Sequence, residues 1–286
     1  MLTQTLKNVV KSSFRTVGIE VHKVRSEEPA NAVVEKRTYS NLDEQRIIWD
    51  YLTELDVREK YCVDIAASDG VTMSNTYSLY EAGYGGLAVE CDPGRFRSLA
   101  QHFERFPKVT LARCPVTPEN VRALLAANET PLDFGFLNLD IDGYDHYVLK
   151  ALLDSYRPSL ICVEINEKIP PPLKFTVKWD PHYEWKTDHF YGQSISKLNE
   201  LCEQFRYSLV ELHYNNAFLI PSELTERPSL SPEQAYREGY LEKPDRQEKF
   251  PWNANVETAL TLPPEQALAF FTEFFRPYEG QYELSL

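Results

Sequence analysis

Oxygen-bearing side chains are paired at two points of the chain, each at the end of an apolar run. Asp140 and Asp142 form one pair, and Glu164 and Asn166 form the other. Residues two apart on a β-strand point to the same side, so each pair presents its oxygens together. Hard divalent cations such as Mg²⁺ prefer oxygen ligands, and the four residues therefore predict a metal site. The alternative is that one carboxylate caps the following helix while another hydrogen-bonds a cofactor.

A second group of residues is suited to holding a nucleoside. Asp64 lies in the apolar run 61–65, which is followed by the small-residue turn 66–70, Ala-Ala-Ser-Asp-Gly. Small residues let a ligand approach the backbone, although the turn lacks the glycines of a pyrophosphate cradle. Glu90 ends the next apolar run, where a carboxylate can accept hydrogen bonds from both hydroxyls of a ribose. Asp92 is near enough to take that role, and Glu90 would then be an ordinary carboxylate at a strand end.

Alternating strand and helix patterns supply the scaffold for both groups. The predicted strands span 61–65, 86–90, 109–112, 134–141, 160–165, 207–214 and 217–220. The predicted helices span 42–55, 72–81, 94–106, 144–153, 194–205 and 264–275, and another opens at 117–119. The sequence therefore predicts an α/β fold with a doubly wound, mostly parallel seven-stranded sheet of Rossmann-like type that ends in an antiparallel hairpin. Ligands of such sheets bind at the carboxyl ends of the strands, where both groups of residues lie.

The charge balance limits the classes of function. Lys and Arg number 30 against 43 Asp and Glu, and this acidic excess disfavours nucleic acid as a partner. Residues 1–25 are the exception, with five basic residues and one acidic residue in an amphipathic helical pattern. This segment is expected to make a peripheral membrane contact or to dock on its own domain or a partner subunit, which is compatible with a homo-oligomer. The five cysteines form no CxxC pair, which predicts a cytoplasmic protein without disulfides. No apolar run is long enough to span a membrane, so membrane association is expected only through residues 1–25.

The order of these motifs resembles a class I S-adenosylmethionine-dependent methyltransferase and, within that superfamily, the FkbM-like group. The resemblance covers roughly residues 43–220. It rests on the Val63-Asp64-Ile65 strand, the turn ending in Asp69-Gly70, the acidic segment 88–93 (AVECDP), the segment 140–145 (DIDGYD) and the closing hairpin. It implies methyl transfer from S-adenosylmethionine to a hydroxyl of a saccharide or related metabolite, in glycan or natural-product biosynthesis.

The resemblance also implies a role for individual residues. Those implied to bind the cofactor are Asp64, Ala66, Ser68, Asp69, Gly70, Glu90, Asp92, Arg113 and Asp140. Ala66 departs from the pattern, because many members of the family have glycine at that position.

Methyl transfer to a hydroxyl requires a group that removes its proton. His189 is the candidate general base because it lies in the aromatic segment 166–193. His146 and His213 are alternatives, and each of the three could instead be a structural histidine. A metal on Asp142 and its neighbours would also promote the reaction by lowering the pKa of the hydroxyl.

The predicted organisation has three parts. A basic amphipathic helix and linker at 1–42 precede a cofactor-binding domain at 43–220, which carries an aromatic lid loop at 166–193, and a C-terminal helical extension follows at 221–286. Two other functions fit the same residues. The sequence Asp140-Ile141-Asp142 matches the Asp-x-Asp signature with which metal-dependent glycosyltransferases hold a sugar nucleotide. The third candidate is a non-catalytic adaptor, which only the departure at Ala66 favours.

Overall fold

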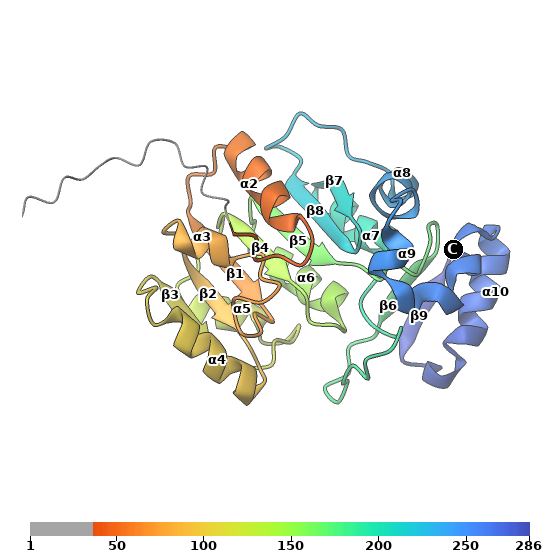
Figure 1. Cartoon of the computed structure of the whole chain (residues 1–286), viewed down its shortest axis with the longest axis horizontal. Coiled ribbons are helices and arrows are strands. Elements are labelled where there is room, and N and C mark those ends of the chain that lie inside the picture. The colour runs from red at the N-terminus through yellow and green to blue at the C-terminus, as the bar shows by residue number, and fades with distance from the viewer. Residues whose placement is uncertain (1–36) are drawn as a thin grey trace, which may run out of the picture. The chain divides into compact units, whose positions relative to one another are not determined.

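Seven strands form one sheet in the order β3-β2-β1-β4-β5-β8-β7 in the computed structural model of this chain (Figure 1). The strands are β1 (Tyr61–Ile65), β2 (Gly85–Val89), β3 (Val109–Ala112), β4 (Phe136–Leu139), β5 (Leu160–Glu164), β7 (Tyr207–His213) and β8 (Asn216–Pro221). Neighbours from β3 to β5 pair in parallel, and β8 pairs antiparallel with both β5 and β7. The predicted fold class, with its closing hairpin, is confirmed.

The structure describes residues 37–286, of which Thr38–Leu286 form one compact unit. The predicted basic helix within residues 1–25 therefore lies outside the described residues. Within the described part, no helix is both long and apolar enough to cross a membrane.

Helices cover both faces of the large sheet. They are α2 (Glu44–Glu54), α3 (Tyr77–Glu81), α4 (Pro93–Phe103), α5 (Val121–Ala127), α6 (Asp145–Leu153) and α7 (Ile195–Phe205). Apolar side chains of α2, α3 and α4 form one core with one face of the sheet, and those of α5, α6 and α7 form a second core with the other face. Burial on both sides explains why the central strands are nearly continuous apolar runs.

The predicted helix 72–81 is wrong over its first half, because α3 begins only at Tyr77. Asp69 accepts hydrogen bonds from the backbone N–H groups of Val71 and Thr72 through one carboxylate oxygen. Ser74 Oγ accepts bonds from the N–H groups of Thr76 and Tyr77. These local side-chain bonds stabilise a loop in competition with helical backbone bonds.

The aromatic segment 166–193 contains a strand that the sequence analysis did not predict. This strand, β6 (Lys174–Val177), pairs antiparallel with β9 (Tyr282–Ser285) in a separate two-stranded sheet. A third apolar cluster joins β6 to the helix α10 (Pro264–Phe274). The segment is therefore partly a structural element and not only a loop.

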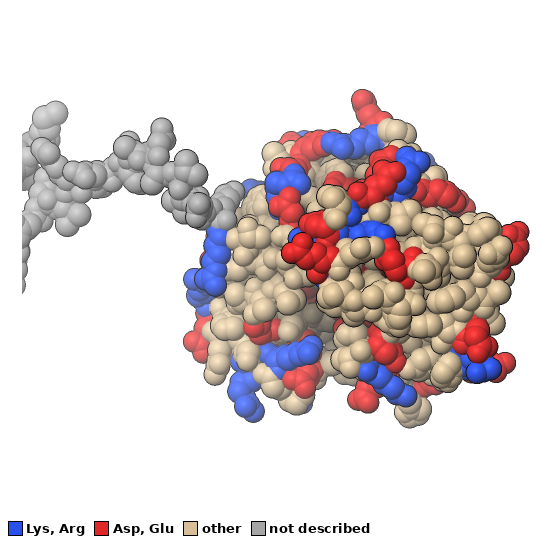
Figure 2. All heavy atoms as spheres, turned by 45° about the vertical axis from the view of Figure 1, so that its right-hand side comes forward, with Lys and Arg blue, Asp and Glu red and all other residues tan. Residues whose placement is uncertain are grey.

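The rest of the C-terminal region consists of short helical turns. They are α8 (Pro232–Tyr236), the π-helical turn η1 (Arg237–Leu241), α9 (Arg246–Lys249), and the 3-10 turns η2 (Pro251–Asn255), η3 (Glu257–Thr261) and η4 (Arg276–Tyr278). On the face shown in Figure 2, acidic and basic side chains are interspersed, as expected for a solvated surface.

Candidate functional site

The carboxyl ends of β1 to β4 enclose a first cavity of about 670 Å³. Its wall includes Asp64, Ala66, Ser68, Glu90, Asn138 and Asp140. Five of these six residues were predicted to bind a cofactor, and the parallel strands bring them together from positions far apart in sequence. A cavity at this edge of a doubly wound sheet is the expected ligand site of the fold.

Glu90 is fixed by its backbone neighbours. Its carboxylate is only 4% exposed and accepts bonds from the backbone N–H of Ser68 at 2.9 Å and of Asp92 at 2.7 Å. Each carboxylate oxygen has further acceptor capacity, because these bonds use one oxygen each. Glu90 can therefore still accept bonds from two ligand hydroxyls while its orientation is held.

Asp64 sits at the floor of the first cavity in a polar network. Thr76 Oγ1 donates to it at 2.6 Å and Asn138 Nδ2 at 2.9 Å, and Asn75 Nδ2 donates in turn to Asn138 Oδ1. Burial raises the pKa of Asp64 to about 6 despite these two bonds. Asn138 was missed by the sequence analysis. The signal that could have found it is a lone amide in the apolar strand, in register with Asp64.

The turn after β1 differs from the expected one. The N–H groups of Ala66 and Ala67 both donate to Val89 O at 2.9 Å, so they hold the turn to β2 and do not point to a ligand. Ala66 and Ser68 have left-handed backbones, with φ of 69° and 53°. The position at which the resembling family has glycine thus adopts a conformation that favours glycine.

Replacing Ala66 by Gly is expected to raise the free energy of unfolding by about 0.5–1 kcal/mol. A left-handed backbone costs an L-residue about 1–2 kcal/mol, and the freedom of glycine in the unfolded chain cancels about 0.5–1 kcal/mol of that gain. Urea unfolding measures the difference. Ala67→Gly is the matched control, because Ala67 does not have a positive φ, and it should lose stability. A loss of stability in both variants would contradict the prediction.

Four predicted cofactor residues lie outside the wall of the first cavity: Asp69, Gly70, Asp92 and Arg113. Asp69 holds the following loop, and Gly70 has a left-handed φ of 77° with Leu99 and Phe103 packed over it. Asp92 caps α4 by accepting two backbone N–H bonds. Arg113 is exposed, and the residues after it, 114–116, form the wall instead. Sequence spacing located the loops but did not show which side chains turn inward.

Asp140, Asp142 and Glu164 form a carboxylate triad whose ligand atoms lie within 4.8 Å of one another. Burial raises the pKa of Asp142 to about 8 and that of Glu164 above its ordinary value, and the neighbouring carboxylates raise both further. Asp140 is exposed at the end of β4. Glu164 Oε1 accepts a bond from Asn215 Nδ2 at 2.7 Å, whereas its buried Oε2 has no partner among the described residues. The triad thus has the donor set and the excess negative charge of a cation site.

Asn166, the fourth predicted ligand, is not part of the triad. Its Nδ2 donates to the carbonyl oxygens of His189 and Tyr191, both at 2.9 Å, and its side chain is fully buried. The strand β5 ends at Glu164, so the two-residue alternation no longer applies at position 166. Asn166 instead ties the end of β5 to the aromatic segment.

A second cavity of about 640 Å³ lies beside the first. Glu164, Lys168, His189, Asn215 and the aromatic residues Tyr191, Phe250 and Trp252 line it. Asp142 and Trp185 line both cavities. Two ligands, one in each cavity, would therefore contact each other next to the triad.

His189, the candidate general base, lines this second cavity. Burial lowers its pKa, and its ring packs against Phe274. His146 is bonded to Gln193 and His213 lies on β7, and neither lines either cavity. Of the three candidate histidines, His189 is thus the one that shares a cavity lining with Asp142 and Glu164.

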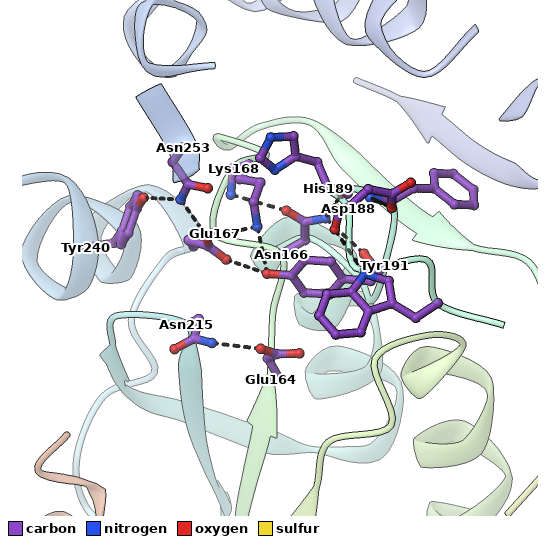
Figure 3. A network of polar contacts seen from close by, with 12 residues as sticks. Glu164, Asn166, Glu167, Lys168, Asp188, His189, Tyr191, Asn215, Tyr240 and Asn253 are labelled. Carbon is purple, nitrogen blue, oxygen red and sulfur yellow. Dashed lines mark hydrogen bonds and ion pairs between the residues drawn. The ribbon is translucent and has the colours of Figure 1, made fainter. Parts of the chain in front are cut away.

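A buried polar network holds the wall of the second cavity (Figure 3). Lys168 Nζ lies 3.0 Å from Glu167 Oε1 and 2.7 Å from Tyr191 Oη. Tyr191 Oη donates to Glu167 Oε2, and Asn253 Nδ2 donates to Glu167 Oε1 at 2.7 Å. The network joins the end of β5, the aromatic segment and the C-terminal region. It was missed because its members are far apart in sequence.

Comparison with known proteins gave matches only among solved structures. No family model matches the chain, and no curated protein matches it. It is similar to an O-methyltransferase from Bacillus cereus in complex with S-adenosylhomocysteine, at 13% identity over 77% of this chain and 90% of that one, with a TM-score of 0.39.

Two further structures match at similar levels. One is the N-terminal domain of EvdMO1 in the presence of S-adenosylhomocysteine and D-fucose, at 11% identity over 75% of this chain and 96% of that one, with a TM-score of 0.43. The other is magnesium protoporphyrin IX methyltransferase from Synechocystis PCC 6803, at 10% identity over 74% and 97%, with a TM-score of 0.40. Identities and TM-scores this low show nothing about function, and the two cavities of this chain carry that information instead.

Proposed function

We propose that this chain is an S-adenosylmethionine-dependent methyltransferase that methylates a hydroxyl of a saccharide or related metabolite. The observation that carries the proposal is the pair of adjacent cavities that share Asp142. A group-transfer enzyme must hold donor and acceptor at one point, and alignment supplies much of its rate acceleration. The motif order that resembles FkbM-like methyltransferases supports the same assignment.

The first cavity fits the cofactor by the chemistry of its wall. Glu90 would hold the ribose hydroxyls, and residues 114–116 at the end of β3 would flank the adenine. Asp64 and Ser68 would surround the methionine part, and Asp140 would lie near the transferred methyl. Carboxylates beside a sulfonium are favourable, because opposite charges attract strongly in a partly buried site.

S-adenosylmethionine would supply a methyl group bound to a sulfonium sulfur. When an acceptor oxygen takes this methyl, the remaining thioether, S-adenosylhomocysteine, is the leaving group. The residues of this chain have to orient the acceptor and remove its proton. His189 can accept the proton, because its lowered pKa keeps the imidazole neutral near pH 7. The carboxylates of the triad are alternative acceptors.

The triad further supports a proposed Mg²⁺ site. Three carboxylates converge, burial raises the pKa of Asp142 and Glu164, and the buried Glu164 Oε2 has no hydrogen-bond partner in the described part of the chain. A hard cation would satisfy that oxygen and allow all three groups to ionise. Asp140, Asp142 and Glu164 would hold the ion, and the ion would lower the pKa of a nearby acceptor hydroxyl.

Calorimetric titration of the full chain with S-adenosylhomocysteine tests the proposal. We expect saturable binding with a dissociation constant in the micromolar range, because the first cavity offers several charged and polar partners. A parallel titration with UDP-glucose and Mn²⁺ tests the glycosyltransferase alternative, which the Asp140-x-Asp142 sequence favours. Binding of UDP-glucose without binding of S-adenosylhomocysteine would overturn the methyltransferase assignment.

A further inference from the structure

Two pairs of aromatic side chains form the walls of the second cavity. Trp185 and Tyr191 come from the aromatic segment and meet edge to face, with ring centroids 5.9 Å apart. Phe250 and Trp252 come from the C-terminal region and meet in the same way at 5.4 Å. The two tryptophans remain 38% and 58% exposed, which is unusual for such large apolar side chains. The cavity therefore offers free aromatic surface to a ligand.

Acidic side chains accompany these walls. The carboxylates of Asp142, Glu164 and Asp188 all line the second cavity. Asp188 accepts a bond from the backbone N–H of Phe190 at 3.0 Å and another from Tyr278 Oη. These two bonds fix the orientation of the Asp188 carboxylate.

The cations of the lining do not balance this charge. Among the described residues of the lining, Lys168 is the only lysine or arginine. Its side chain is 2% exposed, and Figure 3 shows its ammonium held by Glu167 and Tyr191. Because Glu167 neutralises Lys168 internally, the ammonium adds little attraction for an anionic ligand. His189, with its lowered pKa, is neutral near pH 7.

Aromatic faces and carboxylates around one cavity are the arrangement that recognises an ammonium group. We propose that the second cavity binds an acceptor that carries a protonated amine, with Trp185 and Trp252 on either side of it. The inference rests on the proposed function in one respect, which is that the bound amine is called the methyl acceptor. Binding of the amine itself does not depend on methyl transfer. The triad carries less than its full negative charge without a metal, because burial raises the pKa of Asp142 to about 8, and a divalent cation would cancel two of its three charges. The inference therefore relies on the aromatic faces and on Asp188, which lies outside the triad and is unchanged in both states, so the preference for a cation would persist.

The same charges disfavour acidic acceptors. A carboxylate or phosphate in the second cavity would face Asp142, Glu164 and Asp188, and the internally paired Lys168 would not compensate. Sugar acids should therefore bind more weakly than neutral sugars, and neutral sugars more weakly than amino sugars.

Quenching of tryptophan fluorescence by three matched sugars tests the inference. D-glucosamine, D-glucose and D-glucuronate are titrated into the full chain at pH 6.5, with and without Mg²⁺, and tetramethylammonium chloride serves as a competitor. We expect D-glucosamine to bind about tenfold more tightly than D-glucose, which corresponds to about 1.4 kcal/mol and lies within the range of cation–π contacts. D-glucuronate should bind most weakly, and tetramethylammonium should displace D-glucosamine.

Two tryptophan variants localise the effect. Trp252→Leu should remove most of the preference for D-glucosamine, whereas Trp179→Leu should not change it, because Trp179 lies outside the second cavity. Equal affinity for D-glucose and D-glucosamine, or loss of the preference when Mg²⁺ is added, would overturn the inference. Titration with S-adenosylhomocysteine is scored separately, so a failure of the methyltransferase assignment is distinguishable from a failure of the amine site.

Discussion

Replacing Lys168 by Met is expected to lower the free energy of unfolding by about 3–5 kcal/mol, because it leaves the buried carboxylate of Glu167 without its counter-ion. Both residues are at most 1% exposed. Burial raises the pKa of Glu167, but Lys168 and the hydrogen bond from Asn253 outweigh that effect and hold the pKa below its ordinary value. Methionine keeps the length of the side chain, so the loss reports charge and not shape.

Guanidinium chloride unfolding of a double-mutant cycle measures this effect. Glu167→Gln alone should also destabilise, while the combined variant E167Q/K168M should lose much less than the sum of the two. Arg46→Met is the control, because Arg46 belongs to an exposed ion pair and should cost about 0.5 kcal/mol or less. Additive losses in the cycle would mean that the pair does not interact as the structure shows.

The effect of Lys168→Met should also depend on pH. The folded-state pKa of Glu167 is lowered, so the stability it contributes is present above its unfolded pKa and is lost as pH falls through the folded pKa. The difference between wild type and Lys168→Met should therefore shrink below about pH 4, where the unfolded chain also protonates this carboxyl.

Replacing Glu90 by Gln is expected to weaken the binding of S-adenosylhomocysteine about 100-fold. Hydrogen bonds to an ionised carboxylate contribute about 1.5–3 kcal/mol each, and Glu90 has acceptor capacity for two ribose hydroxyls in addition to its two backbone bonds. Glutamine keeps the shape but replaces one acceptor oxygen by a donor. The new NH₂ group would face the backbone N–H of Ser68 or Asp92, so a smaller loss of stability is expected beside the loss of affinity.

Calorimetry measures the affinity of this variant, and thermal unfolding without ligand confirms that it folds. Glu104→Gln is the matched control, because Glu104 is an exposed carboxylate at the end of α4 and away from the first cavity. An unchanged affinity in Glu90→Gln would show that Glu90 holds only the backbone of Ser68 and Asp92, and that the ribose binds elsewhere.

The large sheet was predictable because each of its strands is a short apolar run between helical patterns. The strand β6 was not predictable, because it has only four residues and because its partner β9 lies more than 100 positions later in the sequence. The start of α3 was misplaced for a different reason. Asp69 and Ser74 take backbone N–H groups that a helix at 72–76 would have used, and that competition is not visible in apolar periodicity.

In the candidate site, too, some features could be predicted from local sequence patterns and others depend on distant contacts. The three carboxylates of the triad lie together as predicted, but two-residue alternation does not explain it, because Asp140 and Asp142 follow the end of β4 and Asp142 has a left-handed φ of 53°. The alternation fails in the same way beyond the end of β5 at Asn166. Asn138 lies within β4, yet only the register of β1 and β4 places it against Asp64. Residues on strand ends could be predicted from local patterns, whereas Lys168 and Asn253 depend on distant packing.

Because β6 pairs with β9 near the end of the chain, the two cavities can form at different times during protein synthesis. Apart from residues 183–185, the wall of the first cavity comes from the continuous stretch 64–144, which leaves the ribosome early. The second cavity needs Phe250 and Trp252, and its aromatic segment is joined to β6, whose partner reaches Ser285. A nascent chain can thus assemble its first cavity well before its second cavity. Exchange of segments 178–193 and 250–253 between homologues would accordingly change the second cavity while leaving most of the wall of the first cavity intact.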